Sequence, residues 1–356
     1  MPYLLFFIYL LLFCWLITKI KFFKASGIGN KNLIILFLLR VLAALANGWI
    51  SLFYYGETDS TFFHKEGIIE YHLLLSDPKT YLTNIFYNYN RGLFGGLMDI
   101  SNSFWNNLKS NVIIKLLSIF NIFSNTHYFI NALFYNFLVF FGSVALYRSF
   151  KNIAPQKNFL VLPACFLLPS TLYFSSGIHK DGLVFLSLSI VCFSFFKILR
   201  GRKSIGLFVT VFFGLAMIFV LRSFVLVTLL PVLIAWLLCE KIERPRWMIF
   251  ASVYFVFIVC FFGIGRLFPN LDLPKIVADR QAAFVEISKK SNSQIESTSL
   301  QPTFKSFAEN APKAISNVLL RPTLFEIWTP LYIPLAVETT LYVLAVIVFI
   351  FFPEKK

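Results

Sequence analysis

Long apolar runs separated by short polar stretches dominate the pattern of this chain. Each run is continuous rather than alternating, and several reach the ~20 residues that a helix needs to cross about 30 Å of hydrocarbon. The pattern therefore predicts an all-α, polytopic membrane protein with about nine transmembrane helices. They are expected at about 3–18, 32–54, 127–147, 159–175, 182–199, 205–220, 224–239, 247–265 and 330–352.

Two segments between these runs are too long to be simple turns, namely 55–126 and 266–329. The first ends in an apolar stretch, 112–124, which is short for a span and is expected to lie in the membrane interface. The second contains helical apolar spacing at 275–290 and a further expected helix at 303–320. We expect one membrane domain, 1–356, with these two segments as external helical excursions.

Basic residues define the expected topology. Five short stretches hold 16 of the 32 Lys and Arg but only 3 of the 17 acids: 19–31, 148–158, 197–203, 240–246 and 353–356. Basic residues in short loops are retained in the cytoplasm. The N-terminus is thus expected outside and the C-terminus inside, in the inner membrane of a bacterium. The first run carries no cleavage-site pattern, so we expect it to be an anchor helix.

Composition excludes two classes of protein. At 58% hydrophobic and 14% charged residues, the chain is not expected to be a soluble domain. Its net charge of +15 is accounted for by the basic loops, so nucleic acid is not an expected partner.

Two carboxylates directly after the second run are the first candidate catalytic residues. Glu57 and Asp59 stand two residues apart at the expected external surface. Such a pair can act as a general base or bind a divalent cation. Solvated acids at a helix end are the simpler interpretation.

The turn between the fourth and fifth runs is the second candidate. It holds His179, Lys180 and Asp181 among small residues. The two basic side chains can bind phosphate, and Asp181 can orient one of them. Alternatively, Asp181 caps the helix that follows.

Other charges lie at or inside the apolar runs. Arg222 stands alone in the turn between the sixth and seventh runs, and Arg321 precedes Glu326 just before the last run. Each Arg can bind an anion, snorkel to the headgroups or form an ion pair. Arg40 and Glu338 fall within runs, where charges are usually paired.

Evidence for a metal or a nucleotide is weak. His64 and His72 follow the acidic pair, but their spacing matches no zinc pattern, and surface histidines are the simpler interpretation. No Walker loop or G-x-G-x-x-G motif is present. The pattern identifies no metal ligand, and a divalent cation is the one cofactor that it leaves open.

An acid pair after an early span, followed by an interfacial helix, resembles the GT-C class of membrane glycosyltransferases. The resemblance rests on Arg40 to Glu70 and on the motif PS…SSGIHKDG at 169–182. It implies a polyprenyl-phosphate-linked sugar as donor and an acid of the first external loop as base. Asp59 or Glu57 would be that base. Lys180, Arg222 and Arg321 would bind the phosphate. His179, Asp181 and Glu326 are further candidate substrate-binding residues.

A different function class stays open. A transporter or flippase, a polymerase or ligase, or a non-catalytic assembly partner would also handle lipid-linked saccharides in envelope biogenesis. Transporters place their sites near the midplane on broken helices, often in repeated halves. The chain shows no repeat, and its candidate charges gather at one face, which favours an enzyme.

Overall fold

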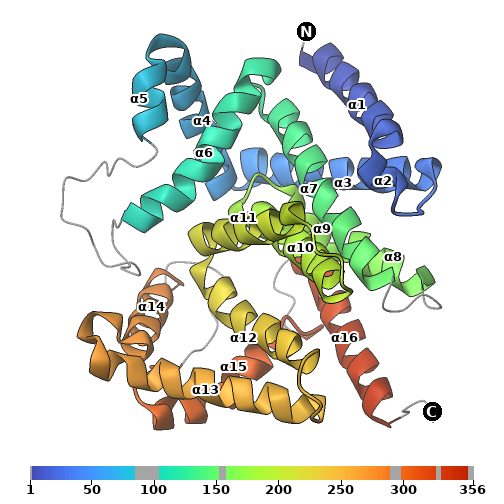
Figure 1. Cartoon of the computed structure of the whole chain (residues 1–356). Coiled ribbons are helices and arrows are strands. Elements are labelled where there is room, and N and C mark those ends of the chain that lie inside the picture. Colours follow the sequence, from blue (N-terminus) through green and yellow to red (C-terminus); the bar gives the residue numbers. More distant parts are fainter. Residues whose placement is uncertain (1, 85–103, 152–157, 289–297, 326–329, 352–356) are drawn as a thin grey trace. The chain divides into compact units, whose positions relative to one another are not determined.

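The computed structural model describes residues 2–84, 104–151, 158–288, 298–325 and 330–351, and within them it is all-helical, with no strand. The chain divides into two compact units, which are described one at a time. The first contains residues 1–91 and 104–230, and the second contains 92–103 and 231–356. Figure 1 labels the helices.

Among the described residues, six helical segments are long and apolar enough to cross a membrane, as expected for a membrane protein. They are Pro2–Lys19, Asn30–Tyr54, Tyr128–Lys151, Phe159–Ser176, Lys180–Leu199 and Arg246–Leu267. The other three expected spans correspond to shorter apolar helices at Ile205–Leu221, Ser223–Cys239 and Ile333–Val348. The expected count of nine therefore stays a prediction, while helical structure occurs at every expected position.

In the first unit, α7 (Tyr128–Lys151) is the central helix. Of its most apolar stretch of 18 residues, 67% is buried, a larger share than in any other candidate span of the described residues. One side of α7 packs in an aromatic cluster with α1 (Pro2–Lys19), α2 (Lys21–Lys24), α3 (Asn30–Trp49) and α8 (Asn158–Phe166). Phe13, Phe37 and Phe140 belong to this cluster.

The other side of α7 packs in a second cluster. It joins α4 (Asp59–Ser76), α6 (Phe104–Ser124) and α10 (Lys180–Leu199) through residues such as Phe63, Leu117, Tyr135 and Leu183. The π-helical turn η1 (Ile50–Tyr54) leads from α3 toward α4, and α5 (Pro78–Thr83) follows α4. Helix α11 (Ile205–Leu221) forms a hairpin with α10, visible in Figure 1.

The expected span at 159–175 is two helices rather than one. Helix α8 ends at Phe166, and α9 (Pro169–Ser176) begins at a proline. A proline lacks the N–H that an uninterrupted helix requires and disfavours helical backbone in the residue before it, so the chain breaks here.

The buried Arg40 has a different role from the ion pair suggested by its position in a span. Arg40 is 3% exposed, and its guanidinium donates to the carbonyl and hydroxyl oxygens of Ser175, at 2.5 and 2.9 Å. Asn136 donates to the Ser176 carbonyl at 2.7 Å. The last carbonyls of a helix have no partner within it and carry partial negative charge. These side chains of α3 and α7 therefore cap the end of α9.

The second unit contains the rest of α12 (Ser223–Cys239) from Pro231 onward and α13 (Arg246–Leu267), followed by η4 (Pro269–Leu271) and α14 (Leu273–Ser288). The unit continues with α15 (Phe304–Leu320), η5 (Pro330–Tyr332) and α16 (Ile333–Phe351). Rings of α13 and α15 pack edge to face, as between Phe262 and Phe307 at 5.5 Å. The expected helices at 275–290 and 303–320 are thus both present, within two residues at each end.

Candidate functional site

Asp59 occupies the first position of α4, where the local sequence holds it firmly. Thr58 caps the helix, and its side chain and that of Thr61 form a reciprocal capping box. The next residue, Ser60, hydrogen-bonds to the Tyr128 hydroxyl of α7. An acid in the first turn is also stabilised by the helix dipole. The exposed Asp59 carboxylate therefore lies at a helix end that the capping box and the Ser60–Tyr128 hydrogen bond hold in place.

Lys180 lies close to Asp59. It opens α10, and its ammonium donates to the Ser110 hydroxyl of α6 at 3.2 Å and lies 5.0 Å from the ring centre of Phe63 on α4. The charges of Asp59, Arg222 and Asp181 all act on it. A lysine ammonium carries three N–H donors, of which Ser110 accepts one here.

Asp181 and Arg222 form an ion pair between α10 and the turn that joins α11 to α12. Arg222 approaches Oδ1 of Asp181 through Nε at 3.1 Å and through Nη2 at 2.9 Å. The Arg222 side chain is 40% exposed and that of Asp181 is 48% exposed. A pair so exposed contributes little to stability. The same exposure makes both side chains accessible to a ligand. Asp181 thus pairs with Arg222, and its charge also acts on Lys180 and His179.

His179 immediately precedes this helix start. Burial lowers the pKa of the imidazole below its ordinary value, the carboxylates of Asp181 and Asp59 oppose that shift, and Arg222 reinforces it. The ring is therefore neutral at neutral pH. The His179 carbonyl accepts a hydrogen bond from the Tyr135 hydroxyl, which fixes the backbone at the turn.

Close packing explains the glycine after Asp181. A Cβ atom on Gly182 would lie 2.4 Å from the Tyr135 hydroxyl oxygen and 2.7 Å from the Ser175 carbonyl oxygen. Both distances are far below normal contact, so only glycine fits. The start of α10 is thereby held against α7 and the end of α9, and this packing positions Lys180 and Asp181.

Of the remaining candidates, Glu57 belongs to the first unit but is not part of this cluster. Glu57 is 92% exposed and has a loose contact with Lys65 at 3.6 Å. Arg321 is an exposed residue of the second unit, at the end of α15. Glu326 lies outside the described residues. The structure therefore brings together Asp59, His179, Lys180, Asp181 and Arg222, all of the first unit.

Metal ligation finds no support in the described part of the chain. No group of three His, Cys, Asp or Glu side chains gathers there in a way that could hold a metal ion. His72 is exposed, but His64 is half-buried and contacts the Asn131 amide through Nδ1 at 3.4 Å. Its ring also packs edge to face on Tyr128 at 5.2 Å. The interpretation of His64 as a surface histidine is thus wrong, because α4 turns it toward α7.

Sequence reasoning did not identify Ser110, Phe63 or Tyr135 as part of the site. A serine in a helix, a phenylalanine among 45 and a tyrosine in an apolar run carry no local signal of function. Only the packing of α6, α4 and α7 around the start of α10 brings them to Lys180 and His179.

The cluster offers a specific set of chemical groups. Two cations can bind an oxyanion such as a phosphate, and one carboxylate that the cations do not directly contact can accept a proton. Comparison with protein-family models, with curated proteins and with solved structures finds no match to this chain.

Proposed function

We propose that the chain is a membrane glycosyltransferase that moves a sugar from a polyprenyl-phosphate donor to an acceptor on the external face of the bacterial inner membrane. The supporting observation is the cluster of Asp59, Lys180 and the Asp181–Arg222 pair at one end of the apolar α10–α11 hairpin. By the distribution of basic loops, this end is external, with the N-terminus outside and the C-terminus cytoplasmic.

In the proposed reaction, Lys180 and Arg222 bind the donor phosphate. Asp59 accepts the proton of an acceptor hydroxyl as its oxygen forms a bond to the anomeric carbon. The bond between that carbon and the phosphate oxygen breaks, and the lipid phosphate leaves with the electron pair. The two cations stabilise the negative charge that develops on it. No nucleotide pocket is needed because the donor is dissolved in the bilayer.

The test separates binding from transfer. Asp59→Asn should abolish transfer from a panel of radiolabelled polyprenyl-phosphate sugars to membrane acceptors, yet leave polyprenyl-phosphate binding intact, because it removes only the base. Glu57→Gln is the matched control, an exposed acid two residues away whose loss should leave transfer unchanged. Wild-type transfer by Asp59→Asn would refute the proposed base.

Arg222→Ala tests the phosphate site itself. It should weaken binding of polyprenyl phosphate, measured by native mass spectrometry in nanodiscs, because one of the two phosphate-binding cations is removed. Unchanged binding in this variant would leave the Asp181–Arg222 pair a purely structural contact.

A flippase for lipid-linked saccharides is the second candidate, and the break between α8 and α9 favours it. Transporters bind their substrates at such breaks. The end of α9 is, however, occupied by Arg40 and Asn136, which donate to its carbonyls. In proteoliposomes, a flippase would move a fluorescent polyprenyl-phosphate lipid between leaflets, and its Asp59→Asn variant would retain that activity. The proposed enzyme would not move the lipid between leaflets.

A further inference from the structure

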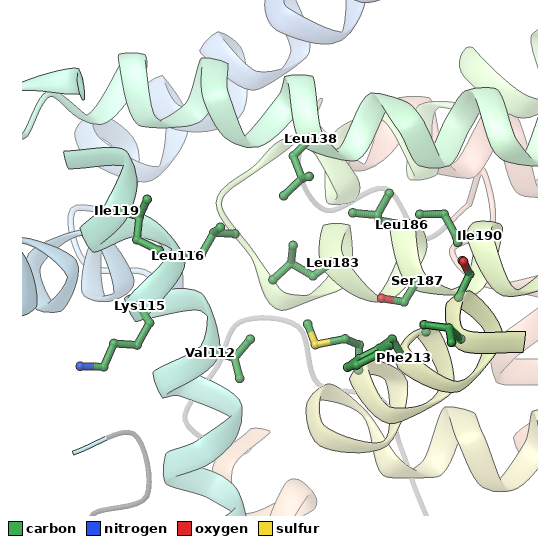
Figure 2. A pocket seen from close by; sticks show the side chains of 14 residues that line it. Val112, Lys115, Leu116, Ile119, Leu138, Leu183, Leu186, Ser187, Ile190 and Phe213 are labelled. Carbon is green, nitrogen blue, oxygen red and sulfur yellow. The ribbon is translucent and has the colours of Figure 1, made fainter. Parts of the chain in front are cut away.

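The first unit contains an apolar cavity of about 630 Å³, lined by residues of α6, α7, α10 and α11. Figure 2 shows side chains of α6 on one side of the cavity and of α10 on the other, with Leu138 of α7 and Phe213 of α11 lining two further sides. Its volume falls within the ~300–1,000 Å³ range typical of small-molecule sites.

The walls of this cavity suit a hydrocarbon. Leucine, isoleucine, valine, phenylalanine and methionine side chains make up most of the lining. Lys115 contributes its aliphatic stem, since its ammonium bonds to Glu70, away from the cavity. The Thr210 hydroxyl donates to the Gly206 carbonyl of its own helix at 2.6 Å. A ligand here would therefore be held mainly by burial of apolar surface.

The cavity begins one helical turn from the charges. Its wall residue Leu183 follows Lys180 by one turn of α10, or roughly 4.5 Å along the axis. Met217 stands slightly more than one turn before Arg222. From there the lining continues along α10 to Ile190, roughly 10 Å further and toward the basic turn that joins α10 to α11. The charges thus stand at one end of an elongated apolar site.

We infer that this cavity holds the hydrocarbon chain of a membrane lipid whose phosphate is bound by Lys180 and Arg222. The inference rests on the proposed function for the phosphate site, but not on the transfer step or on Asp59. A lipid with an anionic head and an apolar chain is the occupant because two cations mark one end and the rest of the lining is hydrocarbon. A soluble phosphate would leave the apolar walls exposed.

Photocrosslinking of the full chain in phosphatidylcholine nanodiscs tests the location. The probe is farnesyl phosphate with a diazirine at the end of its chain. We expect labelled peptides from the cavity walls of α10 and α11, and loss of label when unlabelled farnesyl phosphate is added in excess. Labelling only at other surfaces, or labelling that excess farnesyl phosphate does not reduce, would overturn the inference.

Two matched pairs of variants test the wall. Phe213 lines the cavity and is 63% exposed, whereas Phe212, on the same helix, is 68% exposed and lies outside the lining. Phe213→Ala should weaken farnesyl phosphate binding about ten-fold, and Phe212→Ala should not, because only the first removes apolar surface from the site. Likewise Ile119→Trp should block labelling by filling the cavity, and Ile122→Trp should not; these two residues of α6 are similarly exposed.

Comparison with Arg222→Ala distinguishes the two proposals. If Arg222→Ala loses farnesyl phosphate binding while Phe213→Ala and Ile119→Trp bind normally, the cavity inference fails and the phosphate site stands. If the wall variants lose binding while Arg222→Ala does not, the chain site stands and the proposed phosphate site fails. The corresponding diazirine probe made from farnesol, which lacks the phosphate, should label the same walls in both the wild type and Arg222→Ala.

Discussion

Removal of the Lys115 ammonium should destabilise the first unit strongly. Its Nζ lies 2.5 Å from Oε2 of Glu70, 2.5 Å from the Asn84 side-chain oxygen and 2.6 Å from the Tyr81 carbonyl oxygen. The side chains of Lys115 and Glu70 are only 12% and 10% exposed. Lys115→Met would leave Glu70 a buried charge without its cation, which costs roughly 3–5 kcal/mol in comparable pairs.

A second substitution isolates the cause. Asn84 donates to the other oxygen of Glu70 at 2.8 Å, and a glutamine at 70 can still accept that bond. The Lys115→Met, Glu70→Gln double variant should therefore recover most of the loss, since no isolated charge remains. The free energy of unfolding would be measured in mixed micelles with increasing SDS.

The exposed pair of Lys65 and Glu57 provides the control. It has side chains 65% and 92% exposed, and Lys65→Met should cost under ~1 kcal/mol. The reasoning would be refuted if Lys115→Met cost no more than Lys65→Met. It would equally be refuted if the double variant were as unstable as Lys115→Met alone, because the cost would then not come from the charge left on Glu70.

Three further predictions follow from single features. Burial lowers the pKa of His64 from 6.5 to about 4, so the imidazole takes up a proton at a lower pH in the folded chain than in the unfolded chain. The free energy of unfolding should therefore fall by roughly 3 kcal/mol as pH drops from 6.5 to 4. Unfolding measured across that range should show that His64→Gln abolishes this loss and that His72→Gln does not. Gly142→Val should destabilise the chain by more than ~2 kcal/mol in the same assay, since its Cβ would lie 2.9 Å from Leu186 Cα, while Gly263→Val enters open space. A reporter fused after Lys203 should behave as cytoplasmic, and an external signal would reverse the expected topology.

The helices themselves were largely predictable because hydrophobic periodicity and length are local properties. Each expected span contains helical residues, and the helix at 303–320 ends at its expected position. The break before Pro169 was not predicted, although the proline was visible, because an apolar run can contain a kinked or a broken helix. Packing against neighbouring helices decides between the two.

The candidate site was predictable as a set of charges but not as a set of pairs. Asp59, Lys180 and Arg222 could be placed near one expected membrane face from their positions at the ends of spans. The partners of these charges depend on the rotation of each helix about its axis. Rotation is fixed by contacts such as that of Gly182 with Tyr135, which join residues far apart in sequence.

The helical class, the positions of the apolar segments and the charges available for chemistry can all be derived from the amino-acid sequence, because each follows from the preference of a short stretch for lipid or water. The packing of the helices was needed to show that Arg222 pairs with Asp181, that Arg40 caps α9 and that a cavity begins about one helical turn from Lys180. Such pairings and voids arise between helices distant along the chain, where burial forces each polar group to find whichever partner the packing brings within reach.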